Sequence, residues 1–142
     1  MVKRSKVSML DGDHTAQAVI DVVALGDDNE QIVWKNNTGQ SVKITEAAFQ
    51  GDAAHSGADT NNMILQFRNK GVLGTGTTGI TATKEYDSGT DLVAFLSDAL
   101  VLSTTAADLI IDDGETVALN KTESGTGLAS PKGIATLTYE FV

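Results

Sequence analysis

Cysteine is absent from this chain of 142 residues. Its absence excludes disulfide bonds, thiolate metal ligands and cysteine nucleophiles. Long apolar runs are also missing, and without a run of about 18 apolar residues the sequence predicts no transmembrane helix. The first residues, MVKRSKVSMLDGDHT, lack the apolar stretch of about 7–15 residues that a signal peptide needs, so we expect no secretion route of that kind.

Basic residues are few: ten Lys and Arg stand against 19 Asp and Glu, a net charge of −9. Lys3, Arg4 and Lys6 lie within the first six residues, which leaves seven basic and 19 acidic residues, or −12, for the remainder. Binding of DNA or RNA requires neutralisation of phosphates by Lys and Arg. We therefore expect no nucleic-acid partner and attribute the acidity to solubility.

Residues that carry catalysis or bind metals are scarce. The two histidines, His14 and His55, have polar, loop-like neighbours and no nucleophile motif nearby, so we predict that both are solvent-exposed loop residues. Short acidic clusters, such as Asp112-Asp113-Gly114-Glu115, do not follow the spacing of a calcium loop and are explained better as turns. The glycine-rich stretch at 74–79 lacks the Lys of a phosphate-binding loop. We expect no enzymatic activity, metal, cofactor or small-molecule substrate.

Turn residues divide the chain into short segments, and strand-like runs recur about every 8–12 residues, which predicts an all-β sandwich or barrel. Strands are expected at Ala18–Ala24, Gln31–Lys35, Gly79–Thr83 and Ile134–Phe141, in addition to those of the segment described next. Aromatic residues make up 5% of the chain, too few to suggest a platform for stacking sugars. On predicted core faces we place Phe67, Phe95, Tyr139 and Phe141; Trp34 and Tyr86 lie outside these faces, and we favour core packing for Trp34.

The segment Ser41–Gly71 contains the clearest pattern, two strands separated by a polar loop. Alternation begins with Val42 and Ile44 and slips around Glu46, which predicts a β-bulge. Alternation in the second strand places Met63, Leu65 and Phe67 on one face, so all five of these apolar residues are expected in the core. We expect the intervening loop, Gly51–Asn62, to be a surface or inter-subunit loop.

One segment departs from the β pattern, because Leu92, Phe95, Leu96 and Ala99 recur at helical spacing. This predicts a short helix at Asp91–Asp98 and a following strand at Ala99–Ser103. A hairpin is expected between Leu109–Ile111 and Thr116–Asn120. The predicted fold is therefore all-β: a β-sandwich or jelly-roll-like domain at residues 16–142, with one short helix and an extended N-terminal arm at residues 1–15.

The stretches SVKITEAAFQGDAAHSGADTNNMILQFRNKGVLGTGT, IDDGETVALN and GTGLASPKGIATLTYEFV carry a family resemblance. Together, over residues 40–142, the chain resembles small β-rich capsid decoration (cement) or head-fibre proteins of tailed bacteriophages. The resemblance implies a virion structural protein, made in the host cytoplasm. It also implies a homotrimer that binds the major capsid protein on the capsid exterior and stabilises the head.

The N-terminal arm supplies the candidate capsid-binding or subunit-binding residues, since a basic arm on an acidic body suits an acidic shell. These candidates are Val2, Lys3, Arg4, Lys6, Val7, Met9 and Leu10. An untethered terminus is an equal alternative. Two other functions remain open: a tail or fibre module that binds host-surface glycans through Trp34, Tyr86 and the Gly71–Thr83 loop, and a hydrolase that uses the carboxylates of Asp112, Asp113 and Glu115.

Overall fold

Residues 12–142 fold almost entirely into strands and the turns and loops between them. The computed structural model describes residues 12–142. Its strands in this range are β1 (His14–Ile20), β2 (Asn29–Lys35), β3 (Val42–Gly51), β4 (Asn62–Asn69), β5 (Thr78–Gly79), β6 (Lys84–Tyr86), β7 (Asp98–Ala99), β8 (Ile110–Ile111), β9 (Thr116–Ser124) and β10 (Gly133–Phe141). A single turn of 3-10 helix, η1, spans Ala106–Leu109. Within residues 12–142, no helix is long and apolar enough to cross a membrane.

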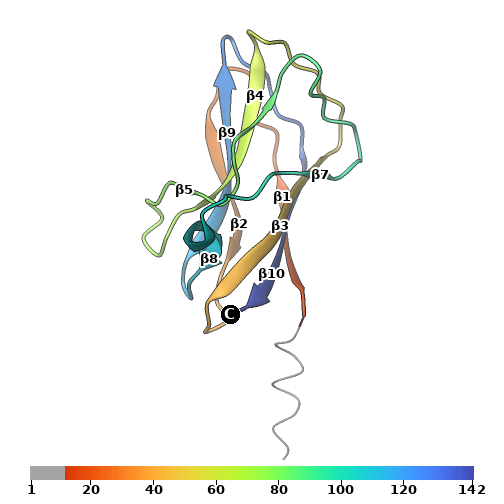
Figure 1. The fold of residues 1–142 in the computed structure, drawn as a ribbon. Helices are drawn as coiled ribbons and strands as arrows, with labels where there is room; N and C mark the ends of the chain where they lie inside the picture. The colour runs from red at the N-terminus through yellow and green to blue at the C-terminus, as the bar shows by residue number, and fades with distance from the viewer. Residues whose placement is uncertain (1–11) are drawn as a thin grey trace, which may run out of the picture.

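Two antiparallel sheets pack face to face (Figure 1). The first has the strand order β1-β10-β3-β7, with β8 also paired to β3, and the second has the order β2-β9-β4-β5, with β6 also paired to β4. Apolar side chains from both inner faces form one buried cluster. Burial of each large aliphatic or aromatic side chain contributes about 1.5–3 kcal/mol, which makes this layer the main source of stability. The predicted all-β sandwich is confirmed.

The predicted β-bulge in β3 is also confirmed. The ladder between β3 and β10 shifts between Ile44 and Glu46, which leaves Thr45 as the extra residue. Ile44 before the bulge and Phe49 after it are both buried, although one position is even and the other odd. The bulge therefore keeps both halves of the strand facing the core. In β4, the predicted inward face of Met63, Leu65 and Phe67 is fully buried.

The predicted helix at Asp91–Asp98 is wrong. The backbone groups of Leu92 bond to those of His55, at 2.9 Å in both directions, and the Phe95 amide donates to the Gly51 carbonyl over 2.8 Å. Partners elsewhere in the chain thus replace the local bonds that a helix requires. Phe95, with φ of 61°, also has a backbone conformation outside the right-handed helical region. Only part of the predicted Ala99–Ser103 strand is formed, since β7 ends at Ala99.

The predicted hairpin between Leu109–Ile111 and Thr116–Asn120 is wrong as well. β8 pairs with Val42 and Lys43 of β3, whereas β9 pairs with β2 and β4 in the other sheet. The turn between β8 and β9 therefore passes the chain from one sheet to the other. The turn residues specify that the chain reverses direction after β8. The strand with which β8 pairs is decided by the burial of Ile111 and by the edge of β3 that is open to pairing.

At the N-terminal end, β1 starts earlier than the predicted strand Ala18–Ala24. His14 pairs with Tyr139, and Thr15 with Thr138, so these two residues of the expected arm belong to the first sheet. Val23 forms an isolated bridge with Ser130 instead of continuing β1.

Candidate interaction surfaces

Three apolar side chains project from one reverse turn. The turn spans Val93–Leu96 and is closed by a bond from the Leu96 amide to the Val93 carbonyl, at 3.2 Å. Val93, Phe95 and Leu96 are all exposed, and Phe95 is 72% exposed. We refer to these three side chains as the tip. The prediction that Phe95 faces the core is wrong because the segment is a turn and not a helix.

Phe95 is held in an unfavourable backbone conformation. Among residues 12–142 it is the one non-glycine residue with a positive φ, and it occupies the third position of the turn, where glycine or asparagine is preferred. An L-residue with a bulky side chain loses about 1–2 kcal/mol in this region. Two bonds fix it there: its amide donates to the Gly51 carbonyl over 2.8 Å, and Gln50 Nε2 donates to its carbonyl over 2.6 Å. The tip is thus a rigid apolar projection.

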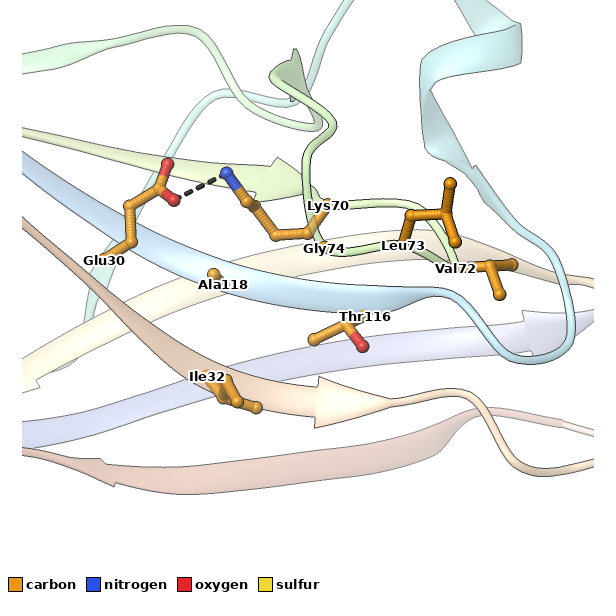
Figure 2. A pocket seen from close by; sticks show the side chains of 8 residues that line it. All are labelled: Glu30, Ile32, Lys70, Val72, Leu73, Gly74, Thr116 and Ala118. Atoms are coloured by element: carbon orange, nitrogen blue, oxygen red, sulfur yellow. Dashed lines mark ion pairs between the residues drawn. The ribbon is translucent and has the colours of Figure 1, made fainter.

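A groove lies on the outer face of the second sheet, next to the loop at residues 70–74. Its volume is about 360 Å³, and Figure 2 shows its lining, which consists of Glu30, Ile32, Lys70, Val72, Leu73, Gly74, Thr116 and Ala118. Ile32 and Leu73 are 70% and 87% exposed. Large side chains exposed together in this way mark a surface suited to binding another molecule. We refer to this feature as the groove.

One edge of the groove carries positive charge. Glu30 accepts from Lys70 at 2.5 Å and from Arg68 at 3.4 Å, so two cations share one carboxylate. Partly exposed pairs of this kind contribute about 0–1 kcal/mol each, so they serve to position charge more than to stabilise the fold. The two cations and one carboxylate give this edge of the groove a net charge of +1, on a chain whose net charge is −9.

The acidic turn between β8 and β9 uses its carboxylates locally. Asp112 accepts from the Ser41 hydroxyl at 2.6 Å, and Asp113 accepts from the Gly39 amide at 2.8 Å. Glu115 accepts from Asn69 Nδ2 and from the Asp112 amide, both at 2.8 Å. These bonds fix the turn and its neighbours, as expected for a structural role. Among residues 12–142, no group of three or more His, Asp or Glu side chains is arranged to hold a metal ion.

Neither histidine is an exposed loop residue, which corrects the prediction. His14 lies in β1, half-buried, with its ring stacked 5.5 Å from that of Tyr139 and 5.0 Å from the edge-on ring of Phe141. His55 is half-buried where the β3–β4 connection meets Leu92. Burial lowers the pKa of His55, and the positive charge of Lys121 lowers it further. Both rings therefore belong to the packed structure.

The two aromatic residues proposed for a glycan site are far from equivalent. Tyr86 is fully buried, and its hydroxyl donates to Asp98 over 2.7 Å. Trp34 is partly buried and stacks on Tyr139 at 4.7 Å, as predicted for core packing. A buried Tyr86 is inaccessible to a sugar, so this pair does not form an exposed stacking platform.

A buried lysine clamps the β1–β2 connection onto β9. Lys121 is 2% exposed, and its ammonium group donates to the Ala24 and Asp27 carbonyls at 3.2 and 2.7 Å and to the Glu123 carboxylate. Glu123 in turn accepts from the Gly26 amide at 3.0 Å. The sequence offered a signal that we missed, because Lys121 continues the inward phase of Val117 and Leu119.

The N-terminal candidates Val2, Lys3, Arg4, Lys6, Val7, Met9 and Leu10 lie outside the described residues. Sequence reasoning also missed the tip and the groove. The exposed runs VL at 72–73 and VAFL at 93–96 were the available signal, but apolar residues next to turns are ambiguous without their neighbours.

Comparison with known proteins finds a remote likeness to a solved structure. No family model matches the chain, and no curated protein matches it. Among solved structures, it is similar to a chain in "Structure of infectious bursal disease virus Gx strain", with a TM-score of 0.42 and 11% sequence identity. The similarity covers 92% of this chain and 33% of that chain, so the protein spans about a third of the viral chain's length. A likeness at this level establishes neither a shared fold nor a shared function.

Proposed function

We propose that the protein is a non-enzymatic virion structural protein, a capsid decoration (cement) protein that binds the outer capsid surface and stabilises the head. The observation that carries the proposal is the apolar outer surface of a rigid β-sandwich. Besides the tip and the groove, Val19 and Ile134 form an exposed pair across β1 and β10. Surfaces of this kind suit protein–protein contacts. The resemblance to capsid decoration proteins over residues 40–142 implies that the partner is a major capsid protein.

The arrangement of the polar groups supports a binding role over a catalytic one. The carboxylates of the acidic turn accept hydrogen bonds from their own neighbours, and Lys121 is enclosed by its partners. Side chains used in this way hold the fold rigid. A decoration protein acts by binding the assembled shell, which shifts the assembly equilibrium toward the intact particle without chemistry.

The basic N-terminal segment is the proposed capsid contact. Its three cations, Lys3, Arg4 and Lys6, would meet acidic groups on the shell, with Val2, Val7, Met9 and Leu10 as apolar anchors. If the protein is a homotrimer, three such segments act together and raise the overall affinity. Deletion of residues 1–10 is expected to weaken attachment and to leave the urea unfolding midpoint of the sandwich unchanged. Undiminished attachment would remove the segment from the mechanism.

Electron cryo-microscopy of particles of the virus that encodes the chain tests the function itself. Density for the sandwich on the outside of the head is expected, and heads that carry it should resist heating better than heads prepared without it. Density confined to the tail, or its absence from purified particles, would overturn the proposal.

A further inference from the structure

We propose that the tip of one copy docks in the groove of a second copy, so that the protein self-associates head to tail. The contact would place Phe95 of one copy against Ile32, Val72 and Leu73 of the next. This inference does not rest on the capsid role, because the two surfaces would meet in solution without any shell.

The backbone of Phe95 is the first observation behind the contact. A bulky residue that has a positive φ and is 72% exposed makes few stabilising contacts within its own copy. The bonds from its amide to Gly51 and from Gln50 to its carbonyl fix the backbone of Phe95, so its side chain leaves the turn toward solvent. A turn whose backbone is fixed before binding loses less freedom on binding, which favours the use of its aromatic side chain as an anchor.

The size and chemistry of the groove fit this anchor. An engineered cavity of about 150 Å³ accommodates a benzene ring, so a groove of about 360 Å³ has room for a phenyl ring and a neighbouring aliphatic side chain. Ile32, Val72 and Leu73 supply apolar walls that are exposed in the single copy. Figure 2 shows Thr116 and Ala118 between Ile32 and the 70–74 loop, where they form a shallow floor of small side chains.

Charge complementarity identifies the occupant as a second copy. Residues 85–98, which contain the tip, include four acidic and no basic side chains. Lys84 pairs with one of them, Asp98, which leaves three negative charges, and Asp91 among these is exposed. The groove edge carries Lys70 and Arg68 around a single Glu30. The acidic tip segment and the cationic groove edge therefore attract each other, and the attraction should weaken with added salt.

The positions of the two surfaces determine the type of assembly. In Figure 1 the loop between β6 and β7 projects at the upper right, whereas the loop between β4 and β5 projects at the lower left. Two different surfaces on opposite sides of the molecule make a heterologous contact. Such a contact forms rings when the rotation closes and open chains when it does not.

The experiment measures self-association by analytical ultracentrifugation over a wide range of protein concentration. Wild type is expected to associate, and less so in high salt. Phe95→Asn removes the ring while keeping a residue that tolerates positive φ, and Leu73→Asp places a charge in the groove. Each should weaken association about tenfold or more. Val101→Asn is the matched control, since Val101 is 73% exposed but lies outside both surfaces, and it should associate like wild type.

Mixing the two variants distinguishes this tip-to-groove contact from a symmetric contact, in which both copies use the same surface. Phe95→Asn retains an intact groove and Leu73→Asp retains an intact tip, so together they should form a one-to-one dimer that grows no further. A monomeric wild type, unchanged association of either variant, or no dimer in the mixture would overturn the proposal. Far-ultraviolet circular dichroism and urea unfolding confirm that each variant is folded. Deletion of residues 1–10 should leave self-association unchanged, so failure of the capsid proposal would be seen separately.

Discussion

Tyr86 of β6 donates its hydroxyl to the carboxylate of Asp98 in β7 over 2.7 Å. Because β6 pairs with β4 and β7 pairs with β3, this bond joins the edges of the two sheets. The other oxygen of Asp98 accepts from Lys84 at 2.6 Å. Burial and, next, the bond to Asp98 raise the pKa of Tyr86, so its hydroxyl remains a donor at every physiological pH.

Tyr86→Phe should lower the free energy of unfolding by about 1.5–3 kcal/mol, the contribution of a hydrogen bond to a charged group. Urea unfolding followed by fluorescence measures the change. Tyr139→Phe is the control, because the Tyr139 hydroxyl makes no hydrogen bond to side chains or backbone of the described residues. Equal losses in the two variants would show that the bond to Asp98 contributes nothing specific.

Lys121→Met should destabilise the protein by about 3–5 kcal/mol, because it leaves the Glu123 carboxylate buried without its cation. Adding Glu123→Gln removes that charge and keeps an acceptor for the Gly26 amide, so the double variant should recover part of the loss. A double-mutant cycle from chemical denaturation is expected to give a coupling energy of about 1–3 kcal/mol. Strict additivity of the two substitutions would refute the pairing.

His55 should make stability depend on pH. Its pKa is lowered in the folded state, mainly by burial, so below about pH 6.5 the unfolded chain binds a proton that the folded chain excludes. Stability attributable to His55 is therefore present above that pH and falls as the pH drops toward the folded pKa, by at most about 1.4 kcal/mol per pH unit. His55→Gln should flatten this slope in urea unfolding measured at a series of pH values. An unchanged slope would contradict the assignment.

Phe95→Gly should raise the free energy of unfolding of the single copy by about 0.5–1 kcal/mol. Glycine removes the backbone strain that phenylalanine has at positive φ, and this gain exceeds the entropy that glycine loses on folding. Val93→Gly is the matched control in the same turn: Val93 is also exposed but has no positive φ to relieve, so its replacement should destabilise. Thermal unfolding at low concentration measures both. Destabilisation by Phe95→Gly would mean that the ring stabilises its own copy.

Local patterns were sufficient for the core strands. The two-residue period identified the buried faces of β3 and β4, and the slip near Glu46 revealed the bulge at Thr45. These predictions succeeded because a strand covered on one face must alternate along its own sequence. The same rule would have placed Lys121 inside, had its charge not argued against burial.

Local patterns failed where distant partners decide the backbone. Leu92, Phe95 and Leu96 have helical spacing, but Leu92 bonds to His55 and Phe95 bonds to Gly51, so the segment forms a turn. The turn at Asp112–Gly114 was recognisable, yet β8 joins β3 because that edge was available. Neither partner can be read from neighbouring residues.

The amino-acid sequence alone determined that this protein is a β-sandwich with an acidic surface, because alternation, turn residues and charge are properties of neighbouring residues and of composition. Tertiary structure alone decided where the apolar residues outside the core would lie. Phe95 became a projection and Ile32 the wall of a groove through bonds and packing between segments far apart in the chain. Those long-range contacts create the surfaces on which we propose that the protein assembles.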